Sequence, residues 1–161
     1  MRPLRLLVPI CGVMLLAACS TTPRGPASVP TAVKAGQSWV VTRPIVAAQV
    51  LDTCSRPSPG RDAGRITGYW APSRQQVEQL EARLAQLTEV DQPGDFDRQY
   101  VGIEADGKQW VYVNAFRLPD DSTIDPAREA IRACGGGRQF WGALYDPQAT
   151  RFSELHFNGA K

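Results

Sequence analysis

The sequence predicts a single α+β domain over residues 37–161, in which a mostly antiparallel sheet packs against one long amphipathic helix. Two β-hairpins and one capped helix are the observations that predict this fold class. The first hairpin turns at Asp106-Gly107, and the second lies near the end of the chain. The helix begins after Pro72 and is apolar along one face, so it can cover a sheet.

Three segments that precede the helix are rich in β-branched and aromatic residues, as strands usually are. They are residues 38–42, 45–51 and 65–70. Pro44 separates the first from the second, and the proline-rich residues 56–60 separate the second from the third. We therefore expect additional strands at the amino-terminal end of the domain.

The predicted long helix begins at Ser73, which forms a Ser-x-x-Gln capping box with Gln76. Apolar residues then recur at helical spacing, whereas charged and amide side chains cover the opposite face. The apolar positions are Val77, Leu80, Leu84 and Leu87. Residues 91–95 contain proline and glycine and end the helix. Its expected role is to cover the core.

The predicted first hairpin pairs residues 99–105 with residues 108–116. Asp-Gly between two strand-like runs favours a two-residue type I′ turn. Pairing across that turn places Ile103 opposite Trp110 and makes one face of the hairpin strongly apolar. The other face is partly apolar as well, so we expect a sheet that is covered on both sides.

The predicted second hairpin pairs residues 140–145 with residues 151–157. Before it, Asp125 and Pro126 have the residue types of a helix start, and Gly135 has that of a helix end. Residues 126–134 are therefore expected to form a short helix, with a strand entering the sheet as the alternative.

Residues 1–18 have the pattern of an export signal. Arg2 and Arg5 precede an apolar run of about ten or eleven residues that Pro9 interrupts, whereas a membrane-spanning helix needs roughly 20. Leu16-Ala17-Ala18-Cys19 resembles the lipobox of bacterial lipoproteins. The resemblance implies cleavage before Cys19, acylation of that cysteine and, because serine follows it, sorting to the outer membrane. An ordinary secretory signal and a single transmembrane anchor are the alternatives.

The mature chain is expected to begin with a lipidated tether over residues 19–36, which contains proline, serine and threonine without apolar periodicity. The whole chain has 18 Lys and Arg against 16 Asp and Glu, and removal of Arg2 and Arg5 leaves 16 against 16. This neutral charge and the absence of a run of basic residues argue against a nucleic-acid partner.

Cys54 and Cys134 are the cysteines that remain once the signal is removed and Cys19 is acylated. In an exported domain such a pair is most simply a disulfide. A metal site or a redox pair is the alternative, although the spacing is not Cys-x-x-Cys and no histidine lies near either cysteine in the sequence.

The carboxyl-terminal part of the chain resembles a group of small proteobacterial envelope lipoproteins. The similarity covers about the last 90 residues and includes the motifs Cys134-Gly135-Gly136-Gly137, Phe140-Trp141-Gly142, Tyr145-Asp146 and Phe152-x-x-Leu155-x-Phe157-Asn158-Gly159. It implies an envelope location and a fold, and it implies no catalytic residue.

We expect a non-enzymatic periplasmic binding domain, such as an inhibitor or immunity factor against an envelope hydrolase. The expected partners are the membrane, through Cys19, and a periplasmic protein or cell-wall material, without a cofactor or a metal. Arg138, Trp141 and Tyr145 are the candidates for a binding groove.

The alternative is an envelope enzyme. It would use His156, the only histidine of the chain, together with Glu154. These residues are two positions apart on a predicted strand, which would place both side chains on one face.

Overall fold

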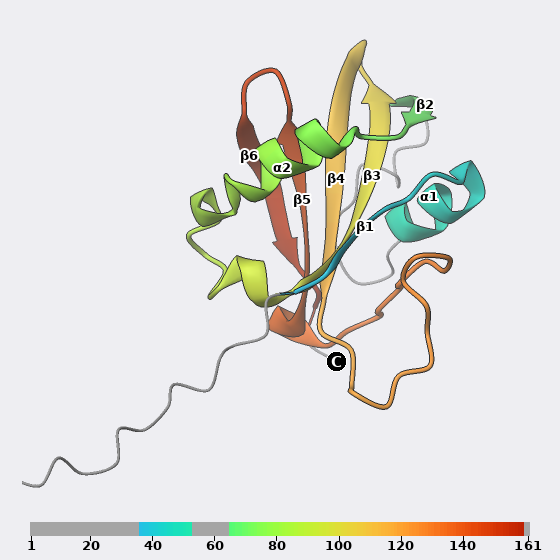
Figure 1. Cartoon of the computed structure of the whole chain (residues 1–161), viewed down its shortest axis with the longest axis vertical. Coiled ribbons are helices and arrows are strands. Elements are labelled where there is room, and N and C mark those ends of the chain that lie inside the picture. Colours follow the sequence, from blue (N-terminus) through green and yellow to red (C-terminus); the bar gives the residue numbers. More distant parts are fainter. Residues whose placement is uncertain (1–35, 53–64, 160–161) are drawn as a thin grey trace, which may run out of the picture. The chain divides into compact units, whose positions relative to one another are not determined.

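The computed structural model describes residues 36–52 and 65–159, which belong to one compact unit, Val33–Lys161. The described residues form six strands, two short α-helices and short 3₁₀ turns (Figure 1). In chain order the strands and α-helices are β1 (Ser38–Val40), α1 (Pro44–Leu51), β2 (Ile66–Trp70), α2 (Arg74–Glu81), β3 (Asp97–Ala105), β4 (Lys108–Phe116), β5 (Phe140–Asp146) and β6 (Arg151–Phe157). The 3₁₀ turns are Leu84–Gln86, Pro93–Asp95 and Gly137–Gln139.

The six strands form one mostly antiparallel sheet with the order β1-β3-β4-β5-β6, and β2 also pairs with β3. The first and second halves of β3 therefore have different neighbours. Ser38 of β1 lies opposite Arg98 in the parallel pair, whereas Trp70 of β2 lies opposite Gly102 in an antiparallel pair. The predicted α+β class with a mostly antiparallel sheet is confirmed.

The β3–β4 hairpin has the predicted register, with Ile103 opposite Trp110 and Val101 opposite Tyr112. Asp106 has φ 51° and Gly107 has φ 71°, and a type I′ turn requires such positive φ angles at both central residues. The predicted second hairpin is present as β5 and β6.

The prediction of one long amphipathic helix is wrong. The Ser73–Gln76 capping box is present, but α2 has only eight residues, and a 3₁₀ turn follows at Leu84–Gln86. A 3₁₀ turn places residues three apart on the same side. Leu84, Leu87 and Val90 are spaced by three and are all buried, so the tighter winding keeps this apolar row on the sheet after α2 ends.

The strand predicted over residues 45–51 is helix α1 instead. Pro44 is in the first turn of this helix, where its fixed φ is favourable and its missing N–H costs nothing. Its buried residues, Val46, Ala47, Val50 and Leu51, have the spacing of one helical face. The β-branched content of the segment reflects burial rather than an extended backbone.

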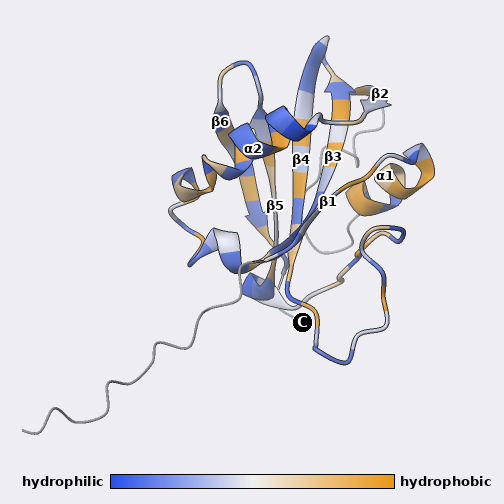
Figure 2. Ribbon diagram, in the orientation of Figure 1, coloured by the Kyte–Doolittle hydropathy of each residue, from blue (hydrophilic) through white to orange (hydrophobic). Residues whose placement is uncertain are grey.

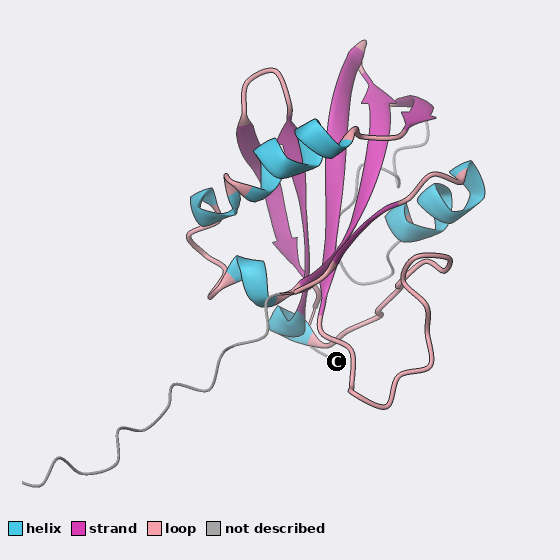
Figure 3. Cartoon of the chain, in the orientation of Figure 1, coloured by secondary structure: helices cyan, strands magenta, loops and turns pink. Residues whose placement is uncertain are grey.

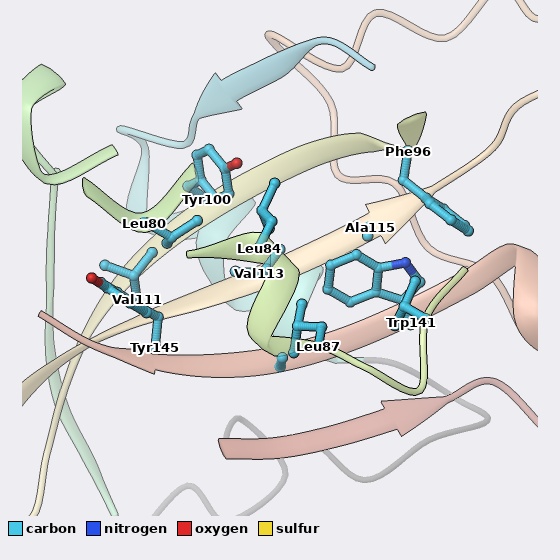
Figure 4. Close-up of a cluster of buried hydrophobic side chains, with 12 residues drawn as sticks. Leu80, Leu84, Leu87, Phe96, Tyr100, Val111, Val113, Ala115, Trp141 and Tyr145 are labelled. Carbon is cyan, nitrogen blue, oxygen red and sulfur yellow. The ribbon is translucent and has the colours of Figure 1, made fainter. Parts of the chain in front are cut away.

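The sheet is covered on both faces, as the hairpin pattern predicts. On one face, α2 and the residues that follow it pack on a cluster that includes Tyr100, Val113 and Trp141 (Figure 4). On the other face, α1 packs on a cluster that includes Val101 and Tyr112. Strand residues therefore alternate between two apolar layers, and the strands and α1 carry much of the hydrophobic colour in Figure 2.

Residues 126–134 form neither the predicted helix nor the alternative strand, and Figure 3 draws this stretch as loop. Asp125 does begin a turn, because its carbonyl accepts from the amides of Arg128 and Glu129 at 3.0 and 2.9 Å. The turn does not continue into a helix.

Two amide side chains of the sheet explain why residues 126–134 do not form a helix. Gln99 and Asn114 lie opposite each other on β3 and β4, and both are buried. The Gln99 Nε2 donates to the carbonyls of Pro126 and Glu129 at 2.7 and 2.6 Å, and its Oε1 accepts from the amide of Ile131 at 3.0 Å. These backbone groups bind the sheet instead of one another, so the segment lies on the sheet as a loop.

A candidate arginine pocket at the end of the sheet

A small cavity of about 230 Å³ lies where β4 ends, β5 begins and β6 ends. We call it the arginine pocket. Its lining residues are Val90, Asp91, Phe96, Arg117, Arg138, Gln139 and Phe157. The volume is below the roughly 300 Å³ at which typical small-molecule sites begin, so the pocket suits one functional group of a larger partner.

Each of the two arginines of this pocket lies over an aromatic ring. The guanidinium carbon of Arg117 is 4.2 Å from the centre of the Phe96 ring, and that of Arg138 is 4.2 Å from the Phe157 ring. These are cation–π distances, and the contact with the ring limits the rotation of each long side chain. The two guanidinium groups are therefore held in place before any ligand arrives.

Backbone contacts fix the segments that carry the arginines. The amide of Arg117 donates to the carbonyl of Gln139 at 3.1 Å, which joins the end of β4 to the start of β5. The Nη2 of Arg138 donates to the carbonyl of Glu89, which anchors it to the segment after α2. Phe96 in turn packs edge-on against Trp141 with ring centres 5.8 Å apart, so the core supports the floor of the pocket.

The arginine pocket carries a formal charge of +1, because Arg117 and Arg138 outweigh Asp91. Within the described ranges 36–52 and 65–159, neither arginine forms an ion pair. A guanidinium presents a planar set of N–H donors that matches a carboxylate. The arrangement can therefore bind an anionic oxygen group.

The groove predicted from Arg138, Trp141 and Tyr145 does not form as expected. Trp141 and Tyr145 are fully buried, because alternate residues of β5 point into the core under α2 (Figure 4). Arg138 is exposed and lines the arginine pocket. Sequence reasoning missed Arg117, since a single arginine after a strand has no distinguishing pattern.

The regular strand alternation that would place Glu154 and His156 on one face is interrupted in β6. The register between β5 and β6 shifts at this point, and Glu154 has a φ of 51°. Leu155 and Phe157 pack on the α2 side, so His156 between them points to the opposite side. Among the described residues, no hydrogen bond or ion pair joins Glu154 to His156.

Cys134 is disulfide-bonded. Its expected partner, Cys54, lies outside the described residues, so the pairing stays a prediction. An ion pair nevertheless joins the neighbouring segments, because the Nη2 of Arg132 lies 2.8 Å from Oδ2 of Asp52. Each of these residues is two positions before one of the cysteines.

Cys19, the signal at 1–18 and most of the tether at 19–36 also lie outside the described residues. In the part of the chain that the structure describes, no helix has the length and apolar character needed to span a bilayer. Comparison with known protein families, curated proteins and solved structures finds no match for this chain.

Proposed function

We propose that this chain is a lipid-anchored protein of the cell envelope whose domain is a non-enzymatic binding module. The acylated Cys19 would hold it at the outer membrane, facing the periplasm, on the tether of residues 19–36. The arginine pocket would bind a carboxylate of a periplasmic protein or of cell-wall material. An inhibitor or immunity factor against an envelope hydrolase would use the pocket to engage an acidic group of that enzyme.

The observation that carries this proposal is that the two arginines of the pocket lie over aromatic rings and pair with no carboxylate of the described residues. Other arginines of the described domain, such as Arg98 and Arg132, lie within ion-pair distance of a carboxylate. Arg117 and Arg138 are instead stacked on phenylalanine rings beside a cavity. An ordered guanidinium that faces a cavity loses little conformational entropy when a carboxylate binds it, which favours recognition.

The disulfide at Cys134 supports the proposed location. Disulfides form and persist in oxidising compartments such as the periplasm and are rare in the cytosol. The export signal and the lipobox-like residues at 16–19 are a separate reason for the same location.

Retention experiments with the full-length chain test the binding module. The acylated protein, immobilised from detergent, is exposed to envelope extract and to isolated cell wall. We expect wild type to retain a component that the variant with both Arg117→Ala and Arg138→Ala retains at least about 100-fold more weakly, because each charge-assisted hydrogen bond contributes roughly 1.5–3 kcal/mol and the variant loses two.

Arg151→Ala is the matched control, since this arginine is exposed and lies outside the arginine pocket. It should retain the component as wild type does. If wild type retains neither a protein nor cell wall, the binding-module proposal is wrong. If the double variant retains the same component as strongly as wild type, the pocket is not the binding site.

The anchor is tested separately by mass spectrometry of the protein purified from its native membrane. The amino-terminal peptide should begin at Cys19 and carry acyl chains, and Cys19→Ala should release the protein from the membrane fraction. An unmodified Cys19 in the native protein would exclude the proposed lipid anchor.

A further inference from the structure

A second and larger cavity, of about 580 Å³, lies beside α2. We call it the glutamine pocket. Its walls come from the start of α2, the start of β4 and the turn between β5 and β6. The lining residues are Ser73, Gln75, Gln76, Gln79, Gln109, Pro147 and Gln148. The volume falls within the roughly 300–1,000 Å³ of typical small-molecule sites.

The glutamine pocket has no charged lining residue, although charged residues are common elsewhere on the surface. The nearest charges on α2 are paired with each other, because Nε of Arg74 lies 2.7 Å from Oε1 of Glu78. The Gln76 amide at the start of α2 is also engaged, since it donates to the Ser73 hydroxyl. The lining therefore offers no charged group to an anion.

Local hydrogen bonds hold the walls of the glutamine pocket. The Gln76 side chain accepts from the Ser73 amide at 2.9 Å as part of the capping box. The backbone amide of Gln148 donates to Oδ1 of Asp146 at 2.8 Å, which fixes the β5–β6 turn. The backbone segments that carry these side chains are thus set by the fold before a ligand binds.

Three of the glutamine side chains remain available to a ligand. Gln75, Gln79 and Gln148 make no side-chain hydrogen bond to any described residue. Each amide offers two donors and one acceptor, and all three amides line the same cavity. Donors and acceptors mixed in this way, without charge, match a ligand that is neutral and carries both kinds of group at close spacing.

We propose that the glutamine pocket binds a neutral oligosaccharide. Sugar hydroxyl and acetamido groups both donate and accept hydrogen bonds, and they carry no charge. An extended polypeptide is the other neutral ligand with such groups. It is less favoured because polypeptide recognition uses a free sheet edge or pockets for side chains, and Pro147 is the one apolar residue in this lining.

Titration of the full-length chain in detergent with a defined sugar tests this proposal. The probe is the β-1,4-linked tetramer of N-acetylglucosamine, and binding is followed by calorimetry. We expect saturable binding that Gln79→Ala and Gln148→Ala each weaken about tenfold, the usual effect of losing one well-formed hydrogen bond. Alanine is a good helix former, so Gln79→Ala should leave α2 intact.

Gln49→Ala is the matched control, because Gln49 is an exposed glutamine of α1 outside the glutamine pocket. It should bind the tetramer as wild type does, and so should Arg117→Ala, which separates this site from the arginine pocket. Affinity should not change between low salt and about 0.5 M salt, since the ligand is neutral.

Two results would overturn the proposal. One is no saturable binding of the tetramer by wild type, or binding that neither glutamine variant weakens. The other is displacement of the tetramer by N-acetylated tetra-alanine amide at equal concentration, which would assign the pocket to polypeptide instead.

Discussion

At the scale of single residues, Tyr100 and Tyr145 are the clearest comparison in the molecule. Both are fully buried in the cluster under α2. The Tyr100 hydroxyl accepts from Nε of Arg98 at 2.9 Å and donates to Oε1 of Glu81 at 3.0 Å. The Tyr145 hydroxyl has no hydrogen-bond partner in the described structure. The same group is thus satisfied at one position and unsatisfied at the other.

Replacement of each tyrosine by phenylalanine should change the free energy of unfolding differently. Tyr100→Phe leaves the buried Arg98 guanidinium short of an acceptor and should lower the free energy of unfolding by about 1–3 kcal/mol. Tyr145→Phe removes a hydroxyl that gains nothing from burial, so it should change stability little or raise it. Denaturant unfolding of both variants measures this, and an equal loss in the two would contradict the hydrogen-bond assignment.

The same residues predict a loss of stability in alkali. Burial raises the pKa of Tyr100 above the usual tyrosine value of about 10, although the charge of Arg98 opposes the shift, and burial also raises the pKa of Tyr145. Above pH 10 the unfolded chain loses these protons first, so it binds fewer protons than the folded chain. The free energy of unfolding should therefore be independent of these groups below about pH 9 and should fall as the pH rises past 10.

Tyr100→Phe should flatten this alkaline decline, because one of the shifted groups is removed. Unfolding curves at a series of pH values from 8 to 11 provide the measurement. A decline of the same slope in wild type and variant would assign the alkaline sensitivity to other groups.

At the scale of elements, the segment between β4 and β5 depends on contacts with the sheet. Gln99 alone binds backbone groups of three residues, and the Nδ2 of Asn114 donates to Oε1 of Gln99 at 3.2 Å and to the carbonyl of Ile131 at 2.9 Å. Further along, the Nδ2 of Asn158 donates to the carbonyls of Ala133 and Gly135 at 2.9 and 2.7 Å. Hydrogen bonds from three buried amide side chains thus take the place of the backbone hydrogen bonds that a helix or strand would form in this segment.

Gln99→Met tests that role, since methionine has a similar length and makes no comparable hydrogen bonds. It leaves the carbonyls of Pro126 and Glu129 and the buried amide of Ile131 without this partner, which should cost about 1–3 kcal/mol for each group that water does not reach. Hydrogen exchange should become faster over this segment before it changes in the β3–β4 hairpin. Gln49→Met, at an exposed position of α1, is the control. Equal exchange in Gln99→Met and wild type would show that the segment is held by other contacts.

The outer edge strand β6 is protected by a single side chain and by its own irregularity. The Oε1 of Gln86 accepts from the Phe152 amide at 3.3 Å, and its Nε2 donates to the Thr150 carbonyl at 3.2 Å. Glu154, with φ 51°, marks the register shift further along the strand. Covered groups and bulges both hinder pairing with another chain.

Gln86→Ala should therefore increase self-association, because it exposes one amide and one carbonyl of the β6 edge. Sedimentation at increasing protein concentration measures this. Gln49→Ala, at an exposed glutamine of α1, is the control. If Gln86→Ala remains as monomeric as that control at every concentration, the bulge alone is enough to protect the edge.

At the scale of the whole molecule, two segments distant in the sequence meet beside the predicted disulfide. Asp52 follows α1 and Arg132 precedes β5, yet the Nε of Arg132 donates to the Asp52 carbonyl at 3.1 Å, and its Nη2 pairs with the Asp52 carboxylate. Both groups are largely exposed, so this pair contributes little stability by itself. A disulfide between Cys54 and Cys134 would join the same two segments covalently.

Replacement of Cys54 and Cys134 by serine should destabilise the domain. The bond would close a loop of about 80 residues, which corresponds to roughly 4 kcal/mol on the chain-entropy model. Denaturant unfolding of wild type with and without reductant, compared with the double variant, measures the loss. Peptide mapping without reductant should recover Cys54 and Cys134 in one cross-linked fragment, and recovery of Cys134 with any other cysteine would refute the pairing.

Local patterns in the sequence predicted those parts of the fold that depend on local geometry. The Asp106-Gly107 turn and the Ser73–Gln76 capping box are both present, because positive φ angles and helix capping are decided within a few residues. The apolar face of residues 77–87 also packs as predicted, since burial follows hydrophobicity.

By itself, then, the sequence determined the mostly antiparallel sheet, the register of the first hairpin and the apolar face of residues 77–87. Only the tertiary structure decided that residues 45–51 are helical, that α2 ends after eight residues, and that residues 126–134 lie on the sheet as a loop. It also decided which residues meet at the arginine pocket. The physical reason is that each of these outcomes depends on partners distant in the sequence, such as Gln99 for the loop and Phe96 for Arg117.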